Sequence, residues 1–279
     1  TIPVMEDFAK DMEEVCAKNY LFINYTNPMA ILSGYMLKYL GINTVGLCHS
    51  VQSCANTILR ELKMDEYVDH CRWEIAGINH QAWLLEIEDL AGNDLYPEIK
   101  RRAQDAGKGI YNDKNDLVRI EMMKRFGYYI TESSEHTSEY TPWFIKSKYP
   151  EQIEKFNIPL DEYPRRCVNQ INEWEKQRED LVNNVSLTHT KSHEFAAYII
   201  AAMELDRAYR IHGNVLNKGL ITNLPYDCCV EVPCLVDRNG VSPCYVGNLP
   251  EQCAAINRTN INVQMLTMQA AKSRRKEDV

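Results

Sequence analysis

The chain has 279 residues, 45% of them hydrophobic and 25% charged, so it is long enough for one large domain or two small ones. Its formal charge of −8 and its short basic clusters argue against a nucleic-acid partner. The longest apolar run, Phe195 to Met203, is far shorter than the roughly 20 residues of a membrane span. No signal peptide opens the chain, so we expect a cytoplasmic protein without a membrane partner.

The ten cysteines show no zinc-type spacing and no CxxC pair. Several of them lie inside apolar runs, where a free cysteine behaves as a small hydrophobic residue. A chain of this length needs no disulfides to hold its core. We therefore expect reduced thiols.

The first part of the chain alternates between predicted helices and strands. After an opening helix, a short apolar run covers Tyr20 to Tyr25, and a second helix is predicted from Pro28 to Leu40, with Gly41 ending it. A second strand-length run, Thr44 to Cys48, precedes a helix from Val51 to Leu62. This order with short connections is typical of a parallel α/β sheet.

The hydrophobic period changes after residue 70. Two strands, Arg72 to Ile78 and Ala82 to Ile87, are separated by a short polar turn and predict an antiparallel pair. A charged stretch from Lys100 to Asp116 precedes an amphipathic helix from Leu117 to Phe126. Lys146 to Arg166 is rich in charge and proline and is interpreted as a surface connection.

The last third of the chain contains an apolar helix from Ser192 to Tyr209, which we expect at the centre of a domain or at a subunit interface. Cys228 to Val236 and Val241 to Val246 predict a hairpin, because the Asn-Gly pair between them is a strong turn signal. A final helix is predicted to begin near Pro250.

Cys48 and His80 are the first candidates for chemistry. Cys48 follows a predicted parallel strand, at the sheet edge where α/β proteins bind ligands, and His80 lies in a strand-to-strand turn. A thiolate and an imidazole suit a divalent transition metal. From the residues alone, a buried packing cysteine and a hydrogen-bonded turn histidine explain the same pattern.

Polar groups also gather between Thr131 and Tyr140, where carboxylates, a histidine and a tyrosine could act as general acids and bases. The alternative is an ordinary helix start, capped by Ser133 or Ser134. Asn27 ends a predicted strand at the same edge as Cys48, and either binds a ligand or forms a simple strand-to-helix turn.

Taken together, short strings of the sequence resemble glycoside hydrolase family 4, in the order found in that family. The strings are Asn24–Ala30, Val45–Gln52, Gly77–His80, Asp94–Glu98, Glu132–His136, Tyr140–Trp143, Ser192–Glu194, Val230–Cys234 and Asn257–Asn260. The strings cover almost the whole chain. The resemblance points to the branch of the family that acts on α-galactosides.

The resemblance implies an α/β fold like that of lactate dehydrogenase, with a Rossmann domain followed by a mixed α+β domain. It implies that residues 1–70 form the remaining part of the NAD-binding domain and that residues 71–279 form the catalytic domain. The sequence holds no GxGxxG or GxGS turn. We therefore expect that the 279 residues lack the first part of the Rossmann domain. We also expect that they hold NAD⁺ poorly and are inactive alone.

The family's mechanism is an NAD-dependent exception to the two-carboxylate scheme of glycosidases. NAD⁺ takes a hydride from C3 of the sugar, a base then removes the acidified C2 proton, and a divalent metal such as Mn²⁺ stabilises the charge. The bond at C1 breaks by elimination, water adds, and the redox steps reverse. Because the metal ligand is a thiolate, this chemistry needs reducing conditions.

Residue by residue, the resemblance assigns Cys48 and His80 as metal ligands and Tyr140 as the catalytic base. It assigns Asn27 to the sugar and the cofactor beside the metal. At the start of the apolar helix, either Ser192 is a helix cap or His193 points into the site and binds the substrate.

The identity of the catalytic acid stays open in the sequence. Some members acting on phosphorylated sugars have Asp directly after the metal-binding cysteine, whereas this chain has His49. The difference favours unphosphorylated α-galactosides. His49, Glu135 and His136 are the candidates for the acid.

Three other functions remain open from the sequence. The first is a family member acting on α-glucosides or α-glucuronides, and the second is a metal-free 2-hydroxy-acid dehydrogenase that shares the fold. The third is a folded or oligomerising module without activity. We also expect a homodimer or homotetramer, because one helix is apolar on most faces.

Overall fold

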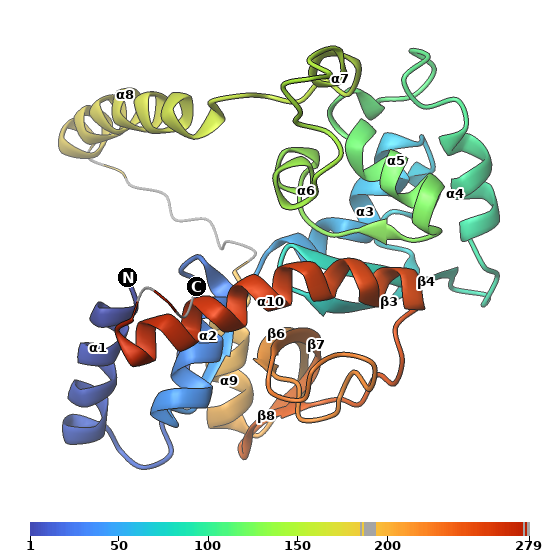
Figure 1. Ribbon diagram of the computed structural model, residues 1–279. Helices are drawn as coiled ribbons and strands as arrows, with labels where there is room; N and C mark the ends of the chain where they lie inside the picture. Colours follow the sequence, from blue (N-terminus) through green and yellow to red (C-terminus); the bar gives the residue numbers. More distant parts are fainter. Residues whose placement is uncertain (185, 187–193, 276, 278–279) are drawn as a thin grey trace.

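The computed structural model describes residues 1–184, 186, 194–275 and 277 (Figure 1). Its eight described strands form one sheet in the order β1-β2-β6-β7-β3-β4-β5, with β8 paired to β7. Only β1 and β2 are parallel among the described pairings, and the others are antiparallel. The strands are β1 (Phe22–Asn24), β2 (Thr44–Gly46), β3 (Cys71–Ile78), β4 (Gln81–Asp89), β5 (Tyr129–Ile130), β6 (Tyr209–Leu216), β7 (Cys229–Asp237) and β8 (Gly240–Pro243).

The alternation predicted for the first part of the chain is confirmed. Helix α1 (Ile2–Val15) precedes β1, and α2 (Met29–Tyr35) continues as a π-helical segment, η1 (Met36–Leu40). Gly41 ends this helix with φ 70°, a left-handed conformation that favours glycine. Strand β2 then leads into α3 (Ser50–Glu61).

The middle part of the chain covers one end of the sheet with short helices. The predicted antiparallel pair is confirmed, with Ile78 opposite Gln81 at the turn between β3 and β4. The helical segments here are η2 (Asp65–Tyr67), α4 (Tyr96–Ala103), η3 (Asp113–Asn115), α5 (Leu117–Phe126), α6 (Ser134–Tyr140) and α7 (Glu151–Lys155). Figure 1 shows α3, α4, α5 and α6 grouped around β3 and β4.

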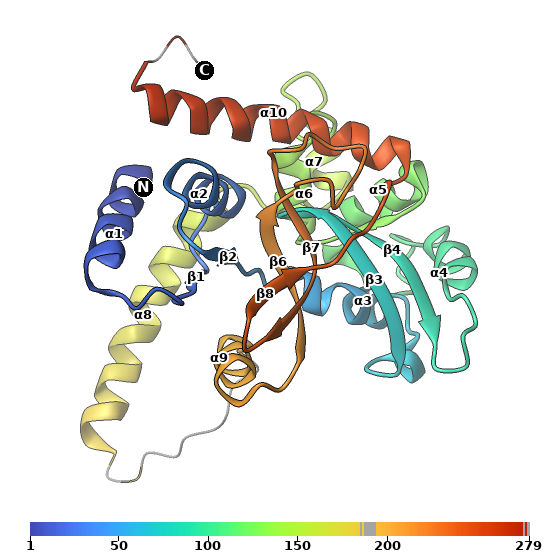
Figure 2. The ribbon, with the colours of Figure 1, turned by 90° about the horizontal axis from the view of Figure 1, so that it is seen from below.

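The interpretation of 146–166 as a surface connection was wrong in part, because the segment contains α7 and the start of α8 (Glu162–Asn183). Helix α8 has no buried residue and extends away from the sheet (Figures 1 and 2). Ion pairs one turn apart, such as Glu162 with Arg165 and Glu175 with Arg178, help an exposed helix to form.

The helix predicted from 192 to 209 is shorter than expected. Helix α9 (Ala196–Leu205) begins after Phe195, and a strand, β6, already begins at Tyr209. Residues 192 and 193 lie outside the described part. Ile199 and Ala202 of α9 are buried but Ile200 is exposed, so α9 covers the sheet with one face and does not lie at a domain centre.

The hairpin of β7 and β8 and the final helix, α10 (Glu251–Ser273), are confirmed. Figure 2 shows α10 extending from α5 to the N-terminal end of α1. The buried core falls into three clusters: one between α1, α2 and α10, one between α3, α4 and the outer strands, and the largest around the central strands. None of the described helices is long and apolar enough to cross a membrane.

Gly46 at the end of β2 lets this strand lie close to α2 and β6. A Cβ atom there would come within 2.5 Å of Ser33 Oγ, 2.6 Å of Met29 Sδ and 2.9 Å of Asn214 Cβ. These contacts are shorter than van der Waals distances. The close approach fixes the position of the residues that follow β2.

We predict that Gly46→Ala lowers the free energy of unfolding by about 1–3 kcal/mol, because the added methyl group must displace buried neighbours. Urea denaturation of the variant measures this change. Ser242→Ala, on the exposed edge strand β8, is the control and should change stability little. An unfolding midpoint equal to that of the wild type would contradict the close packing.

Candidate metal centre

Cys48 lies two residues beyond β2, at the sheet edge where the parallel strands end. The amide of Leu47 still donates to the carbonyl of Asn24 at 2.9 Å, so the chain leaves the sheet only at Cys48. The thiol sulfur lies 3.1 Å from the hydroxyl of Ser50, the first residue of α3. Cys48 is therefore held between a strand end and a helix start.

His80 lies in the tight turn between β3 and β4. Its backbone has φ 63°, a left-handed conformation that is uncommon for a residue other than glycine. Its side chain is buried. The neighbouring Asn79 and Gln81 are also buried, so the turn is enclosed by the protein although it carries polar side chains.

Glu132 comes after β5, directly before the start of α6. The amide of Thr131 donates to the carbonyl of Ala82 at 2.8 Å, and the amide of Ala82 donates to the hydroxyl of Thr131 at 3.1 Å. These two hydrogen bonds place Glu132 beside the turn that carries His80. Glu132 also has a left-handed backbone, with φ 69°.

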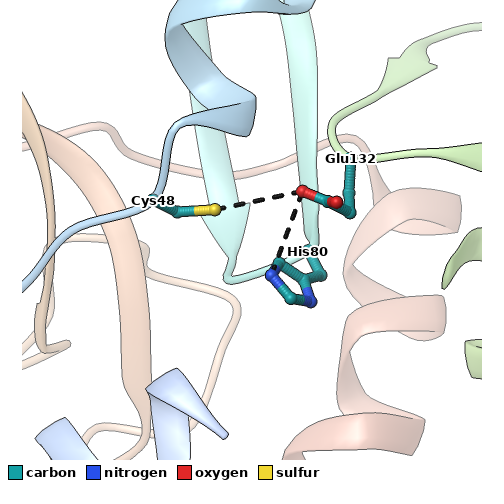
Figure 3. A group of neighbouring side chains, drawn as sticks. All are labelled: Cys48, His80 and Glu132. Atoms are coloured by element: carbon teal, nitrogen blue, oxygen red, sulfur yellow. Dashed lines mark hydrogen bonds and ion pairs between the residues drawn. The ribbon is translucent and has the colours of Figure 1, made fainter. Parts of the chain in front are cut away.

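These three side chains converge, as Figure 3 shows. The Oε2 atom of Glu132 lies 4.0 Å from Cys48 Sγ and 3.9 Å from His80 Nε2. All three donor atoms lie within 4.8 Å of one another, and no second group of this kind occurs among the described residues. Sequence reasoning paired Cys48 with His80 but assigned Glu132 no part in metal binding, because a left-handed backbone at a glutamate leaves no signal in the sequence.

Helix α6 places two more polar rings beside this cluster. His136 and Tyr140 are four residues apart and so share one face of the helix. The ring of His136 lies 5.0 Å from that of His80, and the Tyr140 hydroxyl lies 3.5 Å from His80 Nδ1. Ser133 caps the helix by accepting from the amide of His136, so the helix-start interpretation is also confirmed.

Burial controls the protonation of the cluster when no metal is bound. It raises the pKa of the Cys48 thiol to about 12, helped by the charge of Glu231, while hydrogen bonds with Ser50 act in the opposite sense. Burial lowers the pKa of His80, which favours the neutral imidazole that binds metals. Burial and the charges of Glu139 and Glu132 raise the pKa of Tyr140.

A buried carboxyl lies behind Cys48. Glu231 of β7 is fully buried, and burial raises its pKa to about 8 although Asn214 donates to its Oε1 at 2.9 Å. The same amide of Asn214 lies 3.4 Å from the carbonyl of Gly46 in β2. Asn214 therefore links the strand that leads to Cys48 with β6 and β7.

Helix α10 holds the His80 turn in place through hydrogen bonds to the first residues of β4. The side-chain amide of Asn257 donates to the carbonyl of Gln81 at 2.7 Å and accepts from the indole of Trp83 at 3.2 Å. Asn260 donates to the side chain of Gln81 at 3.0 Å and lies 3.4 Å from the carbonyl oxygen of Tyr140. One turn of α10 thus contacts both the His80 turn and the end of α6.

The other predicted site residues lie around the cluster. His49 is exposed, pairs with Glu194 at 2.7 Å, and shares an open cavity of about 310 Å³ with Glu132. Glu135 is buried and pairs with Arg166 of α8 at 2.7 Å. Asn27 is exposed and accepts from the amide of Met29, at the same sheet edge as Cys48. His193 lies outside the described residues.

The donor set fits a divalent transition metal. A thiolate, an imidazole and a carboxylate are ligands that manganese, iron and zinc sites use, and all ten cysteines of the chain are free thiols. A bound cation would deprotonate the Cys48 thiol despite its burial. Oxygen atoms of a substrate could complete the coordination of such an ion.

Comparison with known proteins identifies the family. Residues 1–64 match the model of family 4 glycosyl hydrolases, and residues 75–279 match the model of the family 4 glycosyl hydrolase C-terminal domain. The chain belongs to glycosyl hydrolase family 4. Family 4 relatives include an α-galactosidase of Bacillus subtilis (strain 168), 57% identical over the whole chain, and one of Rhizobium meliloti (strain 1021), 36% identical over 97% of it. The chain spans 63% and 56% of the lengths of these two relatives.

Solved structures share the family 4 fold. A putative glucosidase, lplD, from Bacillus subtilis superposes with a TM-score of 0.85 at 22% identity, over 99% of this chain and 66% of that one. A 6-phospho-alpha-glucosidase from gut microorganisms, in complex with NAD and Mn²⁺, gives 0.74 at 21% identity, over 99% and 65%. Malate dehydrogenase from Aeropyrum pernix gives 0.52 at 12% identity, over 96% and 70%. The similarity to dehydrogenases is therefore one of fold alone. The predicted α/β class with a Rossmann-like part is confirmed.

We predict that Asn257→Ala lowers the free energy of unfolding by about 1–3 kcal/mol, because it leaves the buried indole N–H of Trp83 and the carbonyl of Gln81 without their partner. Thermal or chemical denaturation checks the change. Asn262→Ala, on an exposed position of the same helix, is the matched control and should stay within about 0.5 kcal/mol of wild type. An equal loss of unfolding free energy in both variants would contradict the stabilising role of the Asn257 hydrogen bonds.

We also predict a pH-dependent effect of Glu231→Gln in the metal-free protein. The raised pKa means that the folded state favours the protonated carboxyl of Glu231. The stability that this side chain contributes is therefore complete below about pH 4.5, the ordinary pKa of a glutamate, and is lost as the pH rises from there through about 8. The variant should therefore gain on wild type across this window, by a few kcal/mol in order of magnitude at pH 8. Denaturation in EDTA at several pH values measures the difference, and a difference independent of pH would contradict it.

Proposed function

We propose that this chain is the catalytic part of an enzyme that hydrolyses α-galactosides with the help of NAD⁺ and Mn²⁺ or another divalent metal. The observation that carries the proposal is the convergence of Cys48, His80 and Glu132 at the edge of the sheet. The two α-galactosidases at 57% and 36% identity support this sugar over others.

In the proposed site, Cys48 and His80 hold the metal, which when bound would act as a Lewis acid toward oxygens of the sugar ring. Tyr140 would act as the base that takes the proton from C2, since its hydroxyl lies beside His80 at the mouth of the cluster. A cation close to this hydroxyl would offset the burial and the negative charges that now raise its pKa. Asn27, at the same sheet edge, is proposed to contact the sugar and the cofactor.

The proposed acid is one of two histidines. His136 lies against the cluster, 3.9 Å from Glu132 Oε1, and His49 borders the adjoining cavity. Glu135, the third candidate, is occupied by its ion pair with Arg166 and is the weakest of the three. The role proposed for His193 in substrate binding rests on the family resemblance alone.

The 279 residues contain no Gly-rich strand–turn–helix, so we assign the phosphates of NAD⁺ to no residue of this chain. A boundary near residue 70, between the Rossmann-like part and the catalytic domain, is supported by the two family models, which meet between residues 64 and 75. The solved 6-phospho-alpha-glucosidase with NAD and Mn²⁺ supports the same cofactors here.

The alternative substrates are α-glucosides and uronic-acid glycosides. Family relatives named alpha-glucosidase, from Erwinia rhapontici, and alpha-galacturonidase, from Thermoanaerobacter italicus (strain DSM 9252 / Ab9), are each 24% identical to this chain. A panel of p-nitrophenyl α-glycosides, assayed on the complete gene product with NAD⁺, Mn²⁺ and reductant, separates these sugars. A preference for any sugar other than α-galactose would refute the proposed specificity.

We further propose that the protein works in the cytoplasm and as a homodimer or homotetramer. Ten free thiols, one of them a proposed metal ligand, support a reducing compartment. Exposed apolar side chains on α8 and α9, such as Ile171, Trp174 and Ile200, support association with a second copy. Sedimentation analysis measures the oligomeric state directly.

We predict that Cys48→Ser and His80→Ala each lower the Mn²⁺ affinity of the reduced protein by at least about 100-fold, because each removes a ligand and not only a supporting contact. Isothermal titration calorimetry measures the affinity. Cys16→Ser, at the exposed cysteine that directly follows α1, is the control and should bind Mn²⁺ as the wild type does. Unchanged binding in both ligand variants would refute the proposed centre.

A further inference from the structure

The side chain of Glu132 is directed toward Cys48 and His80, although the connection between β5 and α6 does not need it there. Its side chain is largely buried, yet none of the ion pairs described for it is closer than 3.9 Å. Its Oε2 atom points between Cys48 and His80, as Figure 3 shows. A carboxylate that is partly removed from water and lacks a close cation favours binding one.

The distances match those between ligands of a single ion. Bonds of about 2.1 Å to oxygen or nitrogen and 2.3 Å to sulfur, meeting at a tetrahedral angle, separate two donor atoms by roughly 3.6 Å. Glu132 Oε2 lies 4.0 Å from Cys48 Sγ and 3.9 Å from His80 Nε2. These two distances exceed 3.6 Å by only a few tenths of an ångström, and the remaining pair, Cys48 and His80, has its donor atoms within 4.8 Å of each other.

The backbone supports the same interpretation. His80 and Glu132 both have left-handed conformations, which cost energy for residues other than glycine and persist where the surroundings impose them. His80 directly precedes β4 and Glu132 lies two residues beyond β5, next to the hydrogen-bonded pair Ala82–Thr131. Residues in such conformations cluster at active sites and ligand sites.

The charges also balance. Cys48 as a thiolate and Glu132 as a carboxylate carry two negative charges, which equal the charge of a divalent cation. Cys48 and His80 alone would leave a net positive charge in a largely buried position, and such a charge is costly without a partner. The Nε2 atom of His136 lies 3.9 Å from the other carboxylate oxygen of Glu132, Oε1.

We propose that Glu132 is a third protein ligand of the metal, so that the ion is held by a thiolate, an imidazole and a carboxylate. This inference rests on the proposed metal centre of Cys48 and His80. It assigns Glu132 to the ion and not to the proton transfers of the reaction.

The test measures Mn²⁺ binding by calorimetry and electron paramagnetic resonance in the reduced full chain, without substrate. Glu132→Gln keeps the shape of the side chain but removes its charge, and should weaken binding by at least about 100-fold, more than the loss of a residue that only supports a ligand. Glu132→Asp should retain more affinity than Glu132→Gln because it keeps the carboxylate. Glu139→Gln, which removes an exposed carboxylate of α6 beside His136, is the matched control and should bind as wild type does. Circular dichroism establishes that each variant is folded.

The outcomes separate the two proposals. Tight wild-type binding that weakens in Glu132→Gln but not in Glu139→Gln supports the third ligand. Tight binding in both wild type and Glu132→Gln overturns it and leaves Cys48 and His80 as the metal pair. Equal weakening in Glu132→Gln and Glu139→Gln also overturns it, because the effect would then come from overall charge. Absence of binding in the wild type refutes the metal centre itself.

Discussion

The candidate centre depends on the pairing of Ala82 with Thr131. This pair extends the contact of β4 with β5 by one residue, and each strand turns away immediately afterward. On one side the chain turns through His80, and on the other it turns through Glu132, both with left-handed backbones. The two side chains meet because the last hydrogen bonds of the sheet fix where each strand ends. A shift of this register would separate them.

The third group arrives from a different part of the sheet. Cys48 follows the parallel pair β1 and β2, which lies several strands away in the sheet order. The distance is bridged by β6 and β7, since Asn214 of β6 contacts both Gly46 of β2 and Glu231 of β7. The site therefore lies where the Rossmann-like part and the antiparallel part form one continuous sheet. This location agrees with the rule that α/β sheets bind ligands at the carboxyl ends of their parallel strands.

Much of the fold could be predicted from the sequence. Hydrophobic spacing and turn signals identified the alternation in the first 70 residues, the pair β3 and β4, and the hairpin of β7 and β8. Strand β6 was missed because it carries His212, Gly213 and Asn214, which are uncommon in buried strands and are accommodated by tertiary contacts. Helix α8 was missed because its charged, proline-containing start was interpreted as part of a surface connection, and none of its residues is buried in the core.

The candidate site could be predicted only in part. Cys48 and His80 stand at strand ends, which a strand prediction locates, and the family resemblance supplied the reason to join them. Glu132 could not be assigned in this way, because its place depends on the register of β5 and on a backbone conformation that side-chain types do not encode. The same polar segment was correctly interpreted as a capped helix start.

The central claim is that a thiolate takes part in holding the metal at this sheet edge. X-ray absorption spectroscopy of the Mn²⁺-loaded, reduced protein tests it most directly, since sulfur scatters differently from nitrogen and oxygen. If Cys48 binds the metal, one sulfur atom will be found among the nearest neighbours of the ion, and it will be lost in Cys48→Ser. Only oxygen and nitrogen neighbours in the wild-type protein would rule out Cys48 as a ligand.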